Sequence, residues 1–198
     1  MHKLHGKRAL VTAGAQGIGL AISRQLLAAG CEVFVHYRSS ADAARGLKAE
    51  AKSLGQRYAH AAADLTESSE CERLVGEAVK FLGGLDVLVN NAGSLVARKT
   101  LAEADDAFWT EVMSLNVGSA RRVTRAAAPH LIAAAKTGGG ASIVNLSSLA
   151  GRKGGHSGSL VYSTAKGAIL TFTRALASEY DGFITGATLD INGGVYAC

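Results

Sequence analysis

Residues 8–19 read RALVTAGAQGIG, and this stretch decides the fold. Its first part, Arg8–Thr12, is a short apolar run of the kind that forms a buried strand. Its second part is rich in glycine and opens a segment with helical spacing, Gly17–Ala29, which stops at Gly30. A strand, a glycine-rich turn and a helix in this order predict the first unit of an alternating β/α chain.

The rest of the chain repeats that alternation. We expect strands at Glu32–His36, Tyr58–Ala63, Leu85–Asn90 and Ser142–Leu146, and helices at Ala41–Leu54, Glu67–Leu82, about Ala104–Ala135 with Pro129 bending it, and Leu160–Tyr180. Strands that are apolar on both faces indicate a parallel sheet covered on both sides. The sequence therefore predicts an α/β fold: a single doubly wound, Rossmann-like domain over residues 1–198, with a central parallel β-sheet and helices on both faces. We expect Thr137–Gly140 to be a surface loop.

Composition excludes several classes of function. The chain has 198 residues, 48% hydrophobic, and a net charge of +5, but its basic residues are scattered without interleaved aromatics. This favours an anionic small ligand over nucleic acid. No run approaches the roughly 20 apolar residues of a membrane span, and no signal peptide is visible. Cys31, Cys71 and Cys198 lie far apart without metal-ligand spacing, so we expect no metal, reduced thiols and a cytoplasmic location.

The glycine-rich turn is a candidate phosphate site. Gly14, Gly17 and Gly19 would let the backbone approach a pyrophosphate, and the following helix offers unpaired N–H groups. Tight packing is the other reading, but the position at the first strand–helix junction favours the phosphate site.

The second strand ends in HYRSS, residues 36–40, and this tip would meet the adenosine ribose of a dinucleotide. It carries Tyr37, Arg38 and Ser39 and no carboxylate, which favours the 2′-phosphate of NADP(H), with NAD(H) possible. A solvated loop arginine is the alternative.

Several motifs in order make the chain resemble a short-chain dehydrogenase/reductase. They are TAGAQGIG at 12–19, AADL at 62–65, NNAG at 90–93, LNV at 115–117, NLSS at 145–148, YSTAK at 162–166 and a terminal ITGATLDINGG. Their joint occurrence is far more specific than any one of them. The resemblance runs from the first residues to about Ala177 and again over the last 15 or so.

The resemblance implies a role for each matching position. Cofactor-binding residues would be Gly14, Gln16, Gly17, Ile18, Gly19, Tyr37, Arg38, Ser39, Asp64, Leu65, Asn91, Ala92, Gly93, Tyr162 and Lys166, with Asp64 at the adenine. The catalytic group would be Asn116, Ser148, Tyr162 and Lys166. Ser148 is preferred to Ser147 because, in the family, two residues and a glycine follow the catalytic serine.

The chemistry explains why these residue types are needed. A carbonyl oxygen that gains charge during hydride transfer needs a proton and a hydrogen-bond donor. A free tyrosine has a pKa of about 10, and an ammonium one helical turn away favours the phenolate. We therefore expect Tyr162 to be the acid/base and Lys166 its electrostatic partner, with Ser148 orienting the carbonyl. Asn116 would hold a water that links Lys166 to solvent.

The sequence departs from the family pattern in three places. Gln16 stands at a position that is often basic in the family's NADPH users, which weakens the preference for NADP(H). Ala13 stands where a glycine is usual, which matters if this position needs a positive φ. In addition, a strand and a substrate lid expected after the YSTAK helix are absent between about Ala175 and Asp181. Thr188–Asn192 would then occupy a vacant sheet edge or leave it exposed. Either the molecule contains a segment that this sequence omits, which we favour, or the chain is truly shortened.

Two functional hypotheses follow. The first is an oxidoreductase that transfers a hydride between NADP(H) and a ketone or secondary alcohol. The alternative is a shortened, non-catalytic relative that binds dinucleotide or only self-associates.

The resemblance also implies a homotetramer or homodimer through the helices Ala104–Ala135 and Leu160–Tyr180, with packing inside one subunit as the alternative. Arg121, Arg122 and Arg125 form a basic helical face that suits plain solvation or a subunit contact.

Overall fold

A computed structural model of the chain describes residues 4–180. Within that range the strands are β1 Arg8–Val11, β2 Glu32–Tyr37, β3 Tyr58–Ala62, β4 Val87–Asn90 and β5 Ser142–Asn145. They form one parallel sheet in the order β3-β2-β1-β4-β5. The order reverses between β1 and β4, so the crevice outside the carboxyl ends of these two strands is where a doubly wound fold binds ligands.

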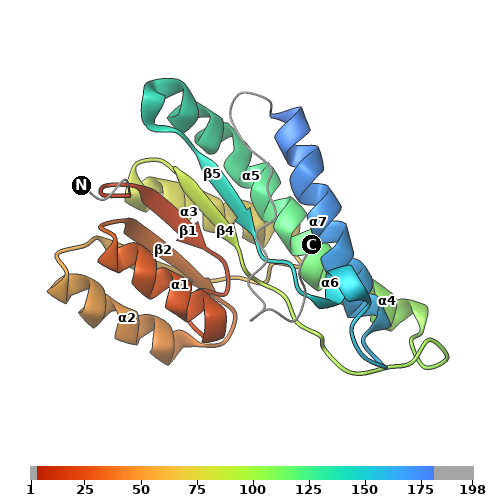
Figure 1. Cartoon of the computed structure of the whole chain (residues 1–198). Coiled ribbons are helices and arrows are strands. Elements are labelled where there is room, and N and C mark those ends of the chain that lie inside the picture. The colour runs from red at the N-terminus through yellow and green to blue at the C-terminus, as the bar shows by residue number, and fades with distance from the viewer. Residues whose placement is uncertain (1–3, 181–198) are drawn as a thin grey trace.

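Helices separate the strands. They are α1 Gly17–Ala28, α2 Ala41–Ser53, α3 Ser68–Leu82, α4 Asp106–Met113, α5 Ser119–Ala134, α6 Ala150–Lys153 and α7 Leu160–Glu179. Helices α1 and α2 cover one face of the sheet, and α3 and α5 cover the other (Figure 1). The predicted doubly wound α/β architecture is confirmed.

Two apolar clusters hold these layers together. On one face Val11, Val33 and Val35 are buried against Leu27 of α1 and Leu47 of α2. On the other face the strands pack on α3 and α5, through residues that include Leu10, Leu88, Leu74 and Leu131. Because successive side chains of a strand point to opposite faces, a sheet covered on both sides needs this unbroken apolar run.

The long helix expected at Ala104–Ala135 is in fact divided. Helix α4 begins after Asp105, whose side chain accepts a hydrogen bond from the N–H of Phe108, and a π-helical turn, Ser114–Gly118, separates it from α5. Pro129 lies inside α5 and does not end it. A second π-type turn, Ala135–Gly139, covers most of the segment expected as a surface loop, and its Gly138 has a φ of 81°. The short helix α6 has no counterpart among the expected elements.

Strand β5 forms one edge of the sheet among residues 4–180. Its Val144 is 47% exposed, since helices α1 and α2 cover the other strands on that face but not β5. On the opposite face, Asn145 donates to the hydroxyl of Thr173 in α7 at 3.1 Å. The terminal motif and the expected strand Thr188–Asn192 lie outside the described residues. In the part of the chain that is described, none of the helices combines the length and apolarity that a bilayer crossing requires.

Candidate active site

The glycine loop and the start of α1 lie at the point where the strand order reverses. Gln16 occupies the N-cap position of α1, but its side chain makes no capping bond to the first turn. The first N–H groups of the helix are therefore available to an anion. Gly17 has a φ of +49°, and a Cβ added to Gly19 would lie 2.2 Å from the carbonyl oxygen of Ala13. Gly19 thus allows α1 to pack closely on the loop, as glycine alone can.

Ala13 has a φ of +48°, the left-handed region that favours glycine. The position where the family usually has glycine therefore does need a positive φ. Asn91 holds the neighbouring carbonyls, because its Nδ2 donates to the oxygens of Thr12 at 3.0 Å and Ala13 at 3.1 Å. The N–H of Ala13 donates to Nδ1 of His36 at 3.0 Å.

The tips of β2 and β3 lie together beside this loop. Arg38 and Ser39 are exposed, and the Arg38 guanidinium lies 4.0 Å from the carboxylate of Asp64. Asp64 accepts from the N–H of Thr66 at 2.9 Å and its hydroxyl at 2.6 Å, and these bonds lower the pKa of Asp64 below its ordinary value. Ser40 donates to Oε1 of Gln16 at 2.7 Å, which joins the glycine loop to the segment after β2.

The segment after β4 brings Asn91, Ala92 and Gly93 to the same crevice. The Thr12 hydroxyl accepts from the N–H groups of Asn91 at 2.9 Å and Ala92 at 3.0 Å. A Cβ added to Gly93 would lie 2.5 Å from Oδ1 of Asn116 and 3.0 Å from Nζ of Lys166. Three residues that are far apart in the sequence, Gly93, Asn116 and Lys166, therefore converge.

Asn116 is buried in the π-helical turn Ser114–Gly118. Its Oδ1 accepts from the N–H of Ser94 at 3.1 Å, and its Nδ2 donates to the carbonyls of Ser94 at 2.8 Å and Val112 at 2.9 Å. The side chain thus holds the segment after β4 against α4. Its expected role in a water link stays a prediction.

Tyr162 and Lys166 lie one turn apart on α7, where the Lys166 ammonium is 5.8 Å from the centroid of the Tyr162 ring. Lys166 is only 5% exposed, and its Nζ donates to the carbonyl of Leu146 at 2.8 Å. Burial lowers the pKa of Lys166 to about 8, because a low-dielectric surrounding disfavours the cation. The YSTAK spacing therefore places an ammonium and a phenol side by side.

The two serines at the end of β5 differ in their contacts. Ser147 donates its hydroxyl to the main-chain carbonyl of Lys166 at 2.6 Å, so its proton is committed to α7. The Ser148 hydroxyl accepts from the N–H of Ala150 at 3.2 Å, which leaves Ser148 its proton to donate. The catalytic role of Ser148 stays a prediction.

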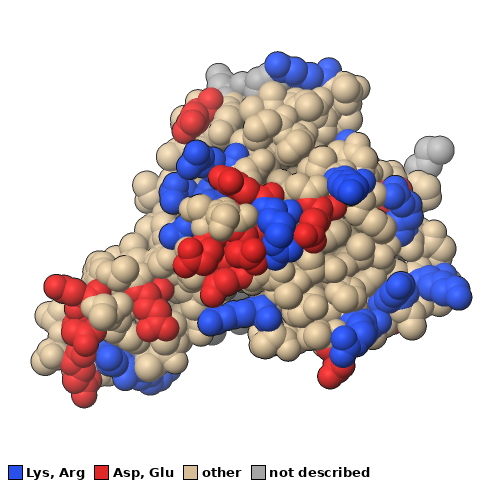
Figure 2. Space-filling view, turned by 180° about the vertical axis from the view of Figure 1, so that it is seen from behind, with Lys and Arg blue, Asp and Glu red and all other residues tan. Residues whose placement is uncertain are grey.

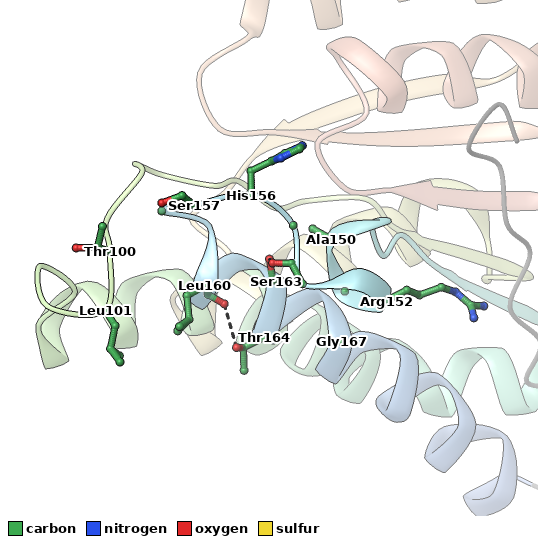
Figure 3. Close-up of a pocket in the computed structure, with 14 residues that line it drawn as sticks. Thr100, Leu101, Ala150, Arg152, His156, Ser157, Leu160, Ser163, Thr164 and Gly167 are labelled. Atoms are coloured by element: carbon green, nitrogen blue, oxygen red, sulfur yellow. Dashed lines mark hydrogen bonds between the residues drawn. The ribbon is translucent and has the colours of Figure 1, made fainter. Parts of the chain in front are cut away.

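A hollow of about 730 Å³ lies beside this group, between residues 100–101, the segment after β5 and α7. Figure 3 shows Thr100, His156, Ser163 and Thr164 around it. None of the expected site residues lines it, although Ala150 and Ser163 are close to Ser148 and Tyr162 in the chain. The hollow is therefore a neighbour of the expected site, but none of the expected site residues forms its wall.

Three residues that hold the site together were given no role by the sequence analysis, although Thr12 lies in the motif TAGAQGIG. Thr12 and Ser94 hold the segment after β4, and His36, one of several scattered histidines without ligand spacing, holds Ala13. A polar residue near the end of a buried strand next to the glycine loop is a signal that could have pointed to His36.

Comparison with known proteins agrees with this geometry. Residues 7–185 match the family model for short chain dehydrogenase. The chain is 35% identical over 173 residues to Nodulation protein G of Azospirillum brasilense, covering 87% of this chain and 68% of that protein. It is 32% identical over 177 residues to 3beta-hydroxysteroid dehydrogenase 2 of Eggerthella lenta, covering 89% of this chain and 66% of that protein. The chain thus spans about two thirds of the length of these curated relatives.

Solved structures give the same result. An NADH-dependent reductase responsible for alginate metabolism superposes with a TM-score of 0.89 at 35% identity, over 93% of this chain and 76% of that one. A short chain dehydrogenase from Burkholderia cenocepacia in complex with NADP has a TM-score of 0.84 at 32% identity, over 93% and 73%. On the fold, the ordered motifs and these matches, the chain belongs to the short-chain dehydrogenase/reductase family of oxidoreductases.

Proposed function

We propose that this chain transfers a hydride between NADP(H) and a ketone or secondary alcohol. The observation that carries the proposal is the buried Lys166 ammonium, whose Nζ lies 5.8 Å from the centroid of the Tyr162 ring, at the crevice that the glycine loop borders. Burial of an ammonium costs free energy of folding, so a buried lysine in a crevice is a candidate functional group. An ammonium beside a phenol favours proton release from that phenol.

The described residues fit a nicotinamide dinucleotide. The first turn of α1 has no capping side chain, which suits a pyrophosphate. Because Gly93 has no Cβ, Asn116 and Lys166 can approach the backbone after β4 closely, and this gathering of polar groups suits the nicotinamide end. When bound, the dinucleotide supplies or accepts the hydride.

Each catalytic residue then has one role. Tyr162 gives a proton to the carbonyl oxygen, or takes one from the alcohol, and Lys166 stabilises the phenolate by its charge. Ser148 donates a hydrogen bond that orients the carbonyl. Asn116 holds the segment after β4 through Ser94, and we keep the water link to Lys166 as part of the proposal.

The preference for NADP(H) rests on Arg38. Its side chain is 73% exposed at the tip of β2, and its guanidinium lies 4.0 Å from the Asp64 carboxylate, the outer limit of an ion pair. This guanidinium can reach an added phosphate, whereas the tip has no carboxylate for a ribose hydroxyl. Solved relatives include complexes with NAD and with NADP. They support the binding of a nicotinamide dinucleotide, and the preference for NADP(H) over NAD(H) rests on Arg38 alone.

The test compares wild type with Tyr162→Phe. NADPH binding is measured by fluorescence, and turnover is measured as NADPH consumption over a panel of ketones, keto esters and 3-oxoacyl thioesters. We expect Tyr162→Phe to bind NADPH within about threefold of wild type and to lose turnover by a factor of about 10² or more. Unchanged turnover would show that Tyr162 is not the acid/base.

The second candidate is a relative that binds dinucleotide without turnover. One observation on residues 4–180 favours it: β5 is an edge strand whose Val144 is 47% exposed, so this side of the crevice is open to water. NADPH binding without consumption of NADPH on any member of the panel would support it, and turnover lost in Tyr162→Phe would exclude it.

Several further properties belong to the proposal. We propose a homotetramer or homodimer and a cytoplasmic location, the latter supported by Cys31 and Cys71, both free and buried. Nucleic acid is not proposed as a partner, because acidic and basic side chains are interspersed on the face in Figure 2. In α3, for example, Arg73 pairs with Glu70 and Glu77 at 2.7 Å. A duplex-binding surface has a continuous basic stripe instead.

A further inference from the structure

His36, near the end of β2, uses both of its ring nitrogens. The side chain is buried, Nδ1 accepts from the N–H of Ala13 at 3.0 Å, and Nε2 lies 3.0 Å from the carbonyl of Ala63. A carbonyl can only accept, so Nε2 carries the proton, and Nδ1 must be unprotonated to receive the Ala13 N–H. The geometry therefore fixes both the tautomer and the neutral state of this imidazole.

The residue on the other end of this bond is strained. Ala13 has a φ of +48°, a conformation that an L-residue adopts only where the surroundings hold it. The main-chain carbonyl of His36 also accepts from the N–H of Gly14 at 2.9 Å. His36 thus binds two successive N–H groups of the glycine loop, one through its ring and one through its backbone.

We propose that His36 is a positioning residue for the dinucleotide: its neutral imidazole holds Ala13 in the left-handed conformation, and a second proton on the ring releases the glycine loop. An imidazolium presents an N–H at both nitrogens, so Nδ1 would face the Ala13 N–H donor to donor. The bond is then lost, and the strained residue relaxes. The proposal rests on the dinucleotide binding of the proposed function.

Burial and the charges around His36 determine the pH at which the ring gains its second proton. Asp64, which follows Ala63, attracts the second proton, while Arg38, just after the end of β2, lies 4.0 Å from that carboxylate and offsets part of its charge. Residues 12–16 of the glycine loop carry no titratable side chain. Burial has the largest effect and lowers the pKa of His36 below its ordinary value. The ring therefore stays neutral at pH 7, and the loop is released only in acid, below the pH at which an ordinary histidine gains its second proton.

The experiment measures the dissociation constant of NADPH from pH 5 to 8 in wild type and in two variants. In His36→Asn, the side-chain amide can offer an oxygen close to the place of Nδ1 and does not titrate. We expect wild-type affinity to fall as pH is lowered, by up to about tenfold per pH unit for one proton. Because the NADPH phosphates also titrate, the observable is the difference between wild type and His36→Asn, which should keep its affinity in acid. His36→Ala should bind weakly at every pH.

Identical pH profiles in wild type and His36→Asn would overturn the proposal. So would wild-type affinity that rises in acid relative to His36→Asn, because the ring would then act as a cation toward the phosphates. A second measurement needs neither variant nor ligand: ¹H–¹⁵N spectra of the free protein should show the Nε2–H tautomer at pH 7.5, and exchange protection of the Ala13 amide should be lost as the ring titrates. Protection that persists after the ring is charged would overturn the inference. If NADPH binds at no pH, the proposed function fails, and the spectra still decide the role of His36.

Discussion

Replacing Ala13 by glycine should stabilise the folded chain, although the change removes a methyl group. Ala13 has a φ of +48°, and the left-handed region costs a non-glycine residue about 1–2 kcal/mol. Glycine avoids that strain but has more freedom in the unfolded chain, which offsets roughly 0.5–1 kcal/mol of the gain. We therefore expect Ala13→Gly to raise the free energy of unfolding by about 0.5–1 kcal/mol.

Ala15→Gly is the matched control two residues away. Ala15 is 1% exposed and its φ is not positive, so glycine there gains nothing and loses a buried methyl group. That loss and the added chain freedom should lower the free energy of unfolding by about 1–2 kcal/mol. The two variants change the same residue type in the same loop and should move stability in opposite directions.

Urea unfolding followed by circular dichroism measures both free energies, and thermal unfolding should show a rise of about 1–4 °C for Ala13→Gly. NADPH affinity should be retained in Ala13→Gly, since the loop keeps its shape with less strain. If both variants destabilise the protein alike, Ala13 is not strained, and its left-handed conformation costs the glycine loop nothing.

Three further predictions concern the site. Lys166→Met removes the buried ammonium. Between pH 8 and 10.5, Lys166 of the unfolded wild type binds a proton that the folded protein does not. As the pH rises through this range, the free energy of unfolding of wild type should therefore increase by about 3 kcal/mol relative to Lys166→Met, as measured by urea unfolding. In Gly19→Ala the new Cβ would lie 2.2 Å from the Ala13 carbonyl, which should cost about 1–3 kcal/mol of stability and weaken NADPH binding. In Arg38→Ala we expect NADPH affinity to fall about 10- to 100-fold while NADH affinity changes little, as titrated by fluorescence.

Each of these has an outcome that contradicts it. A difference between wild type and Lys166→Met that stays constant with pH would mean that Lys166 titrates alike in both states. Gly46→Ala controls for glycine replacement, because a Cβ at Gly46 on α2 meets nothing within 4 Å; a similar loss there would remove the packing explanation for Gly19. Equal losses of NADPH and NADH affinity in Arg38→Ala would show that Arg38 does not read the 2′-phosphate.

The sequence was sufficient for the layers of the fold because their signals are local. The apolar run at β1 and the glycine at the end of α3 each mark an element within a few residues, and Gly83 indeed ends α3 with a φ of +77°. The turn Ser114–Gly118 carries no such local mark. Its residues are compatible with an α-helix, and the hydrogen bonds that Asn116 makes from the turn reach Ser94, 22 residues earlier in the chain.

The candidate site shows the same division. The spacing of Tyr162 and Lys166 predicted their neighbourhood on one helix face, since four residues make about one turn. The burial of Lys166 and the convergence of Gly93 on Asn116 depend on packing between distant segments, which no short motif contains. The role of His36 is hidden for the same reason: a histidine alone does not say that its ring will meet a strained loop.

The π-helical turn between α4 and α5 has a consequence for insertions and deletions in this family of sequences. A wide turn holds one residue more than an α-helix of the same length, so deleting Leu115 would allow a regular helix to run from Asp106 to Ala134. Such a chain would lose no helix, and it could still place α5 against the sheet. The shortened turn would move the Asn116 amide away from Ser94, and the segment after β4 would lose the hydrogen bonds that hold it near Lys166. A length change of a single residue could thus separate folding from chemistry in a segment where every side chain but one was kept.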